Sequence, residues 1–221
     1  MASSSGYDGE AKDVLGSRRS TVLSTVNEST KFVVSCTALG FLLINPTAET
    51  CWALLGSVVN SVNGKILKRV LNQERPDGSR KGDPGMPSSH ATSLSYLSVY
   101  GAASLAHFRD AAPALGYGGQ LIVSGALVLV GMWLSYLRVS TGYHTAPQVV
   151  VGYGLGSTTA LAWLFVGLNY VKPALIAHPE MLRVLHSLLI IAIGWFAFSA
   201  LHWVEGLVDS LKRKFYSLKS D

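Results

Sequence analysis

Residues 120–137 read QLIVSGALVLVGMWLSYL, and this stretch decides the fold class. It contains no charged side chain, and a helix that crosses a bilayer needs about 20 predominantly apolar residues. The whole chain agrees, because 49% of its 221 residues are hydrophobic and 14% are charged. An ordinary soluble domain has about 25% charged residues. We therefore predict an integral membrane protein, and the composition excludes a disordered chain.

Five further apolar stretches surround this one, over residues 32–45, 50–71, 89–107, 147–170 and 184–204. The sequence thus predicts an all-α membrane bundle of six transmembrane helices over residues 31–205. A polar, mobile N-terminal tail is expected over residues 1–30, and a basic amphipathic C-terminal tail that rests on the membrane over residues 206–221. Small residues within the spans, such as Gly152, Gly154 and Gly156, predict close packing of helices.

The positive charges are distributed unequally over the two predicted sides of the membrane. The chain has 18 Lys and Arg and 13 Asp and Glu, which gives a net charge of +5. With six spans, 15 of the 18 cations fall on the side of the two tails and of loops 72–88 and 138–146. The positive-inside rule places that side in the cytosol, or in the stroma of a plastid. The pattern indicates anionic lipid, rather than nucleic acid, as the partner.

Three polar clusters lie on that same side, and the first contains Lys68, Arg75 and Pro76. A spacing of seven would put Lys68 and Arg75 on one helix face, two turns apart, and Pro76 would end the helix. Arginine offers a fork of donors for phosphate oxygens, and lysine adds a point charge. Taken alone, the cluster also fits cations that anchor a helix at the membrane interface.

The second cluster is GMPSSH, residues 85–90, directly before the third apolar stretch. A helix start leaves backbone N–H groups free to bind an anion, and the hydroxyls of Ser88 and Ser89 add donors. His90 would stand beside that anion site at the membrane surface. The alternative is an ordinary helix cap followed by an unrelated histidine.

The third cluster is Arg138, His144 and Gln148, between the fourth and fifth stretches. His144 and Gln148 are four residues apart, so one helix face can hold both, and Pro147 fits the first turn of that helix. Gln148 could accept a hydrogen bond from one ring nitrogen of His144, which would leave the other nitrogen free to attack. The alternative is a polar loop in which Thr145 caps the helix.

Together the clusters supply three cations, two histidines and a helix start at one membrane face, which suits transfer of a phosphoryl group. In this order they resemble the type 2 phosphatidic acid phosphatase superfamily, whose pattern is K-x6-RP, PSGH and SR-x5-H-x3-D. This chain departs from the pattern at three positions, because it has Ser89 for Gly, Leu137 for Ser and Gln148 for Asp. The runs at residues 86–90 and 143–149 resemble dolichyl-diphosphate phosphatases and plant plastid lipid phosphate phosphatases of the epsilon type, in which Gln is normal.

The resemblance implies roles for individual residues. His144 is expected to be the nucleophile that forms a phosphohistidine, His90 the acid that protonates the leaving group, and Gln148 the partner of His144. The expected phosphate-binding group is Lys68, Arg75, Ser88, Ser89 and Arg138.

The expected reaction is hydrolysis of phosphatidate to diacylglycerol and phosphate, with a polyprenyl or dolichyl diphosphate phosphatase as the first alternative. A non-catalytic membrane protein that binds anionic lipid through the same cations is the alternative from another class. We expect no metal and no cofactor, because Asp110 is the only carboxylate between Pro84 and Pro179. By resemblance we expect the plastid inner envelope, with the endoplasmic reticulum second.

Overall fold

The computed structural model describes residues 23, 25–27, 29–30, 32–76, 83–108, 112–195 and 197–198. All of the regular structure in these residues is helical, so the predicted all-α class is confirmed. Each of the six apolar stretches is helical where it is described, except for Asn45 at the end of the first. The helices are residues 32–44, α2 (Ala48–Leu71), α3 (Ser89–His107), α4 (Gly116–Ser140), α5 (Ala146–Val166) and Met181–Trp195.

Two short elements extend α4 and α5. The 3-10 turn η1 (Pro113–Leu115) leads into α4, and α5 continues through the π-helical segment η2 (Gly167–Val171) into α6 (Lys172–Ala177). By length and composition, Pro113–Ser140 and Ala146–Ala177 are long and apolar enough to cross a membrane. The other described helices do not pass this test, so the six spans stay a prediction.

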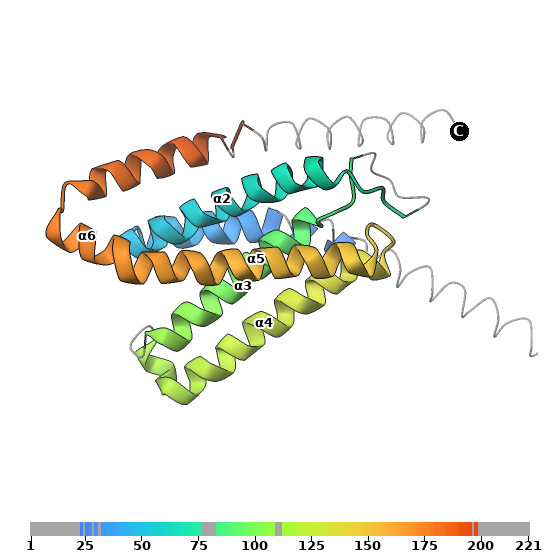
Figure 1. Cartoon of the computed structure of the whole chain (residues 1–221). Coiled ribbons are helices and arrows are strands. Elements are labelled where there is room, and N and C mark those ends of the chain that lie inside the picture. The colour runs from blue at the N-terminus through green and yellow to red at the C-terminus, as the bar shows by residue number, and fades with distance from the viewer. Residues whose placement is uncertain are drawn as a thin grey trace, which may run out of the picture.

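Helix α3 lies at the centre of the bundle. It packs against α4 and α5, and α2 packs against α3 and α5 (Figure 1). The last turns of α2 and α4 and the first turns of α3 and α5 all lie at one end of the bundle, at the right of Figure 1. This arrangement brings the three polar clusters of the sequence to the same end.

Glycines allow α5 to approach α3 closely. A Cβ atom added at Gly156 would come within 2.1 Å of the carbonyl oxygen of Thr92, and one at Gly152 within 2.7 Å of that of Ser88. The predicted close packing is therefore confirmed at these two glycines, which are four residues apart on one face. It is wrong for Gly154, where an added Cβ would meet nothing within 4 Å.

A reciprocal tryptophan pair joins α2 to α5. The rings of Trp52 and Trp163 stack at a centroid distance of 4.3 Å. Each indole N–H donates to the carbonyl oxygen of the other residue, at 3.1 Å from Trp52 and 2.8 Å from Trp163. Two aromatic rings with both N–H groups satisfied fix the spacing of these helices.

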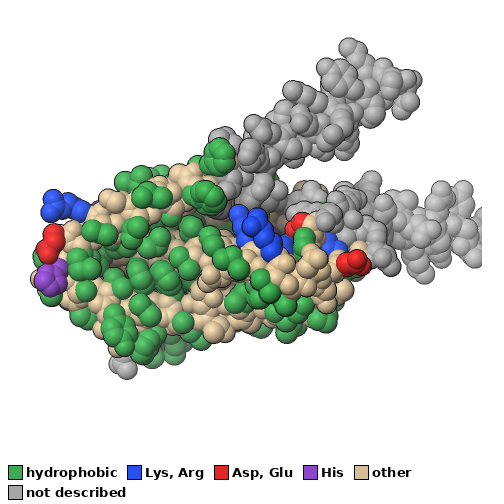
Figure 2. Space-filling view, turned by 45° about the horizontal axis from the view of Figure 1, so that its top comes forward, with side chains coloured by type: hydrophobic (Ala, Val, Ile, Leu, Met, Phe, Trp, Pro, Cys, Tyr) green, Lys and Arg blue, Asp and Glu red, His purple; other side chains and the backbone are tan. Residues whose placement is uncertain are grey.

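Many large apolar side chains lie on the surface of the bundle, and several polar side chains lie inside it. Ile122 is 75% exposed and Leu129 is 65% exposed, whereas Asn60 and Ser95 are fully buried. Figure 2 shows apolar side chains across the middle of the visible face, with charged side chains toward its ends. Large exposed apolar patches mark a surface that contacts lipid or another protein.

Most of the two predicted tails lies outside the described residues. Residues 25–27 and 29–30, within the predicted N-terminal tail, are helical. Asn27 is 2% exposed, and its side-chain N–H donates to the Thr141 hydroxyl at 3.1 Å. Helical structure therefore begins before residue 31. The C-terminal tail, residues 206–221, is outside the described part of the chain.

Candidate active site

The loops at the common end of α2, α3, α4 and α5 bring most of the predicted site residues together. Helix α2 ends at Leu71, because Asn72 takes a left-handed conformation (φ 40°) and donates its N–H to the carbonyl of Lys68. Arg75 therefore lies in the loop after α2, and the prediction that it shares a helix face with Lys68 is wrong. A spacing of seven residues fits both a continuous helix and a helix followed by a loop. The left-handed conformation of Asn72 ends the helix before Arg75.

A tight turn after α4 positions His144. Gly142 has a φ of 72°, a left-handed conformation that glycine adopts without strain. The N–H groups of Tyr143 and His144 both donate to the carbonyl oxygen of Arg138 at 3.1 Å. This turn places His144 two residues before the start of α5, with 3% of its surface exposed.

Gln148 holds one side of the His144 ring. Its Oε1 accepts the backbone N–H of Thr145 at 3.2 Å, and its Nε2 donates to the carbonyl oxygen of Glu74 at 2.7 Å. Because an N–H only donates and a carbonyl only accepts, these two contacts fix the orientation of the amide. Oε1 lies 3.1 Å from His144 Nδ1, so Nδ1 carries the ring proton. The predicted contact between these two side chains is present.

Arg75 lies on the other side of the ring. Its Nη1 is 3.0 Å from His144 Nε2, and it also donates to the carbonyl oxygen of Tyr143 at 2.9 Å. Since a guanidinium group is always a donor, Nε2 must be the acceptor. Both contacts thus specify the same neutral tautomer, with the lone pair on Nε2.

Asp83 binds both cations of the first cluster. Lys68 Nζ donates to Asp83 Oδ2 at 2.5 Å, and Arg75 Nη2 donates to Oδ1 at 2.9 Å. Arg75 Nε also donates to the Asp83 carbonyl oxygen at 2.8 Å. Burial by itself would raise the pKa of Asp83, but the hydrogen bonds and charges of Lys68 and Arg75 outweigh it and lower that pKa to about 2.

The surroundings of His144 favour its neutral form. Burial, as the largest cause, and the charges of Arg75, Arg138 and Lys68 lower the pKa of its ring. The Gln148 hydrogen bond opposes them, and the net result is a pKa of about 4. Arg138 is 7% exposed on the last turn of α4, and its guanidinium carbon lies 4.4 Å from the centre of the Tyr143 ring. A neutral imidazole at pH 7 has the lone pair that a nucleophile needs.

The start of α3 joins the cluster through Gln148. Ser88 is the N-cap of α3, its Oγ accepts the N–H of Ala91 at 3.5 Å, and its own N–H donates to the Gln148 carbonyl at 3.0 Å. Ser88 is fully buried and its hydroxyl oxygen accepts in the cap, while its role in binding phosphate stays a prediction. Ser89 is exposed and His90 half-buried on the first turn of α3.

Sequence reasoning missed Asp83 and the carbonyl of Glu74. Asp83 lies one residue before the carboxylate-poor stretch that begins at Pro84, and no motif contains it. A carbonyl acceptor leaves no signal in the sequence, because every residue has one. Among the residues that the structure describes, no group of three or more His, Cys, Asp or Glu side chains could hold a metal ion.

Comparison with curated proteins finds phosphatases. The chain is 41% identical to lipid phosphate phosphatase epsilon 1, chloroplastic, of Arabidopsis thaliana, over 62% of this chain and 48% of that protein. It is 27% identical to the dolichyldiphosphatase of Saccharomyces cerevisiae (58% of this chain, 56% of the relative) and 30% identical to dolichyldiphosphatase 1 of Mus musculus (69% and 66%). The chain spans about half the length of the plant and yeast relatives. No family model matches the chain.

A solved structure shares the fold. It is a transmembrane PAP2 type phosphatidylglycerolphosphate phosphatase from Bacillus subtilis, with a TM-score of 0.56 and 18% sequence identity. The similarity covers 68% of this chain and 77% of that one. At this identity the comparison shows a common helical architecture.

Proposed function

We propose that the chain is a membrane lipid phosphate phosphatase. It is a relative of the lipid phosphate phosphatases and dolichyldiphosphatases, as its resemblance to the type 2 phosphatidic acid phosphatase superfamily predicts. Its proposed reaction is hydrolysis of phosphatidate to diacylglycerol and phosphate. The observation that carries this proposal is the His144 ring, held between Gln148 and Arg75 with the lone pair on Nε2.

In the first step, Arg75 Nη1 leaves the lone pair of His144 Nε2 and donates to a phosphate oxygen instead, Nε2 attacks phosphorus, and the bond from phosphorus to the glycerol oxygen breaks. His90 donates a proton to the departing oxygen, and the product is diacylglycerol. Lys68, Arg75 and Arg138 neutralise the phosphate oxygens, with the Ser89 N–H as a further donor. The Nδ1–H bond to Gln148 steadies the ring while it carries the phosphoryl group.

In the second step, water attacks the phosphohistidine and the bond from phosphorus to Nε2 breaks. His90, which lost its proton in the first step, takes one from this water and is restored. Phosphate leaves, and His144 returns to its neutral state. Because three cations supply the positive charge, the proposed reaction needs neither a metal ion nor another cofactor.

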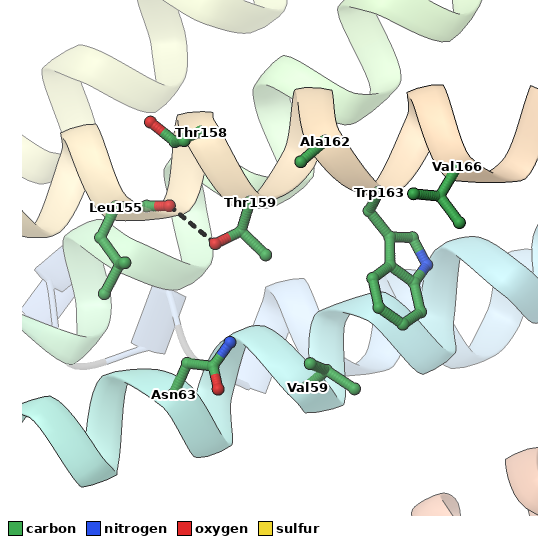
Figure 3. A pocket seen from close by; sticks show the side chains of 8 residues that line it. All are labelled: Val59, Asn63, Leu155, Thr158, Thr159, Ala162, Trp163 and Val166. Carbon is green, nitrogen blue, oxygen red and sulfur yellow. Dashed lines mark hydrogen bonds between the residues drawn. The ribbon is translucent and has the colours of Figure 1, made fainter.

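An apolar groove supports a lipid substrate. It lies between α2 and α5 and has a volume of about 330 Å³ (Figure 3). These helices also carry Lys68 and Gln148, and Asn63 in the groove is five residues from Lys68, or about 7.5 Å along the helix. We propose that the hydrocarbon chain of a substrate whose phosphate is bound at the site lies in this groove. The lining residues are Val59, Asn63, Leu155, Thr158, Thr159, Ala162, Trp163 and Val166.

The apolar surface and the two long apolar helices support a multi-pass position in a membrane. The plastid envelope is the proposed location, because two relatives are described as chloroplastic. The endoplasmic reticulum is the alternative.

A second candidate substrate is a polyprenyl or dolichyl diphosphate, which the dolichyldiphosphatase relatives favour. Release of phosphate from phosphatidate, a sphingoid phosphate, a prenyl phosphate and a prenyl diphosphate, all in EDTA, decides between the candidates. We expect phosphatidate to react fastest. A faster reaction with the diphosphate would establish the second candidate, and binding of anionic lipid without any release would establish a non-catalytic lipid-binding protein.

The pKa of His144 can be tested directly. A pKa lowered to about 4 means that the ring stays neutral down to about pH 5 and takes up its second proton only below that. In protein labelled with ¹⁵N-histidine, we expect the His144 ring to show the Nδ1–H tautomer at pH 7 and a midpoint near pH 4. Arg75→Gln removes a nearby cation and should raise the midpoint. A midpoint near 6.5 in the unmodified protein would contradict the assigned surroundings.

The groove can be tested by filling it. Ala162→Trp places an indole among the lining residues, so we expect kcat/KM for long-chain phosphatidate to fall about tenfold, equivalent to ~1.4 kcal/mol of lost binding energy. Dihexanoyl phosphatidate, whose chains are short, should react within about twofold of the normal rate. Leu161→Trp is the matched control, since Leu161 is exposed on the same helix outside the groove. Equal losses for both substrates would rule out the groove as the chain site.

A further inference from the structure

We propose that Gly85 is a positioning residue, because the absence of a side chain there leaves the space in which the Gln148 amide holds the His144 ring. This inference rests on the proposed function and deepens it, since it gives the loop before α3 a part in the site. It also makes Gly85 and Gln148 a matched pair. The glycine accommodates the longer side chain that this chain has in place of the Asp of the superfamily pattern.

The space beside Gly85 is filled by the Gln148 side chain. A Cβ atom added at Gly85 would lie 2.4 Å from Nε2, 2.8 Å from Cδ and 2.8 Å from Oε1 of Gln148, which are the three heavy atoms of the amide. The φ of Gly85 lies outside the left-handed region. What the glycine supplies here is therefore room for the amide and not a left-handed turn.

Backbone hydrogen bonds hold this segment against Gln148. The Gly85 N–H donates to the Gln73 carbonyl oxygen at 2.5 Å, and the Ser88 N–H donates to the Gln148 carbonyl oxygen at 3.0 Å. Gly85 is itself buried. Because the segment is held on both sides, a methyl group added at Gly85 would displace the end of the Gln148 side chain, whose torsions turn more easily than this backbone.

The Gln148 amide has no spare hydrogen-bonding capacity with which to compensate for such a shift. Its Oε1 accepts from His144 Nδ1 and the Thr145 N–H, and its Nε2 donates to the Glu74 carbonyl and, at 3.3 Å, to Gln73 Oε1. Two acceptor positions and two donor hydrogens are all that an amide has. Gln148 is 1% exposed, so little water can replace a lost partner.

Gly85→Ala is therefore expected to displace the amide and leave the fold intact. Nε2 of Gln148 must move by about 1 Å to bring the contact from 2.4 Å to an ordinary 3.4 Å. Arg75 still donates to His144 Nε2, so the ring keeps its Nδ1–H tautomer and loses the hydrogen bond of Nδ1–H. We expect to see this loss in the ¹⁵N-histidine spectrum of the full chain in micelles. We also expect kcat for phosphatidate to fall about tenfold and KM to change by about twofold or less.

Gly154→Ala is the matched control. Gly154 lies on the same helix as Gln148, and a Cβ atom added there would meet nothing within 4 Å. This change should leave both the His144 spectrum and kcat as they are in the unmodified chain.

The double variant Gly85→Ala/Gln148→Asp tests the pairing of the two residues. Aspartate is one methylene shorter than glutamine, so its carboxylate ends short of the space that the new methyl group takes. We expect Gly85→Ala to change the kcat of Gln148→Asp by about twofold or less, against about tenfold in the unmodified chain.

An intact Nδ1–H hydrogen bond in Gly85→Ala, a Gly85→Ala chain that no longer folds, or equal losses of kcat in the two backgrounds would overturn the proposal. The spectrum is recorded without turnover. If the chain releases no phosphate but Gly85→Ala still removes the Nδ1–H hydrogen bond, only the proposed function is refuted.

Discussion

His144→Ala is expected to lower kcat for phosphate release from phosphatidate by about 10⁴-fold or more, the scale of loss seen when a covalent nucleophile is removed. Alanine leaves nothing that can attack phosphorus at the position of Nε2, while Arg75 and Lys68 remain to bind the substrate. KM should therefore change much less than kcat. The measurement is steady-state phosphate release in micelles.

His107→Ala is the control for this change, because His107 lies at the opposite end of α3 and its ring contacts Phe108. It should react within about twofold of the unmodified chain. If His144→Ala keeps more than a tenth of the rate while its thermal unfolding is normal, another group is the nucleophile and the proposed mechanism is wrong.

Gln148→Leu is the change with the second largest expected effect, a loss of about 100-fold in kcat, since a misplaced reacting group costs about this much. Leucine has a similar size but removes both halves of the amide. The His144 ring loses its Nδ1 partner, and the Glu74 carbonyl and Thr145 N–H lose theirs. Because Arg75 still donates to Nε2, the ¹⁵N spectrum of His144 should keep the Nδ1–H tautomer but show that the hydrogen bond of Nδ1–H is lost, a change that lost stability alone does not produce.

Gln148→Asp separates orientation of the ring from charge. A carboxylate can still accept the His144 Nδ1–H, so measurable activity should remain. It cannot donate to the Glu74 carbonyl, so the rate should stay below that of the unmodified chain. Equal rates for the unmodified chain and Gln148→Leu would remove Gln148 from the site.

The helices and the polar clusters are visible in the sequence because apolar runs and their boundaries leave clear signals. The third stretch has the predicted bounds, since Ser88 caps it and His107 ends it. The contact between His144 and Gln148 is present as well, although the spacing of four suggests a shared helix and His144 in fact precedes α5. The turn at Gly142 brings the His144 ring beside Gln148, where a shared helix would also have placed it.

What the sequence does not reveal are contacts between loops that are far apart in the chain. Asp83 meets Lys68 across 15 positions, and Gln148 reaches the Glu74 carbonyl across 74. Neither partner is marked by spacing, because loop conformation and not helical periodicity sets these distances.

These loop contacts also explain the departure from the family pattern at Gln148. An amide has both a donor and an acceptor, so one side chain can bind the His144 ring and the Glu74 carbonyl at once. It thereby joins the loop that carries Arg75 to the loop that carries His144. An aspartate at this position could hold the ring but not the second loop.

The most direct test of the phosphohistidine mechanism is to trap the intermediate. Phosphatidate labelled with ³²P is mixed with the protein, the reaction is stopped in alkali within one turnover, and the peptides are sequenced. We predict label on His144 that is stable to alkali and lost in acid, and no label in His144→Ala. Release of labelled phosphate by a chain that never carries label on His144 would contradict the account.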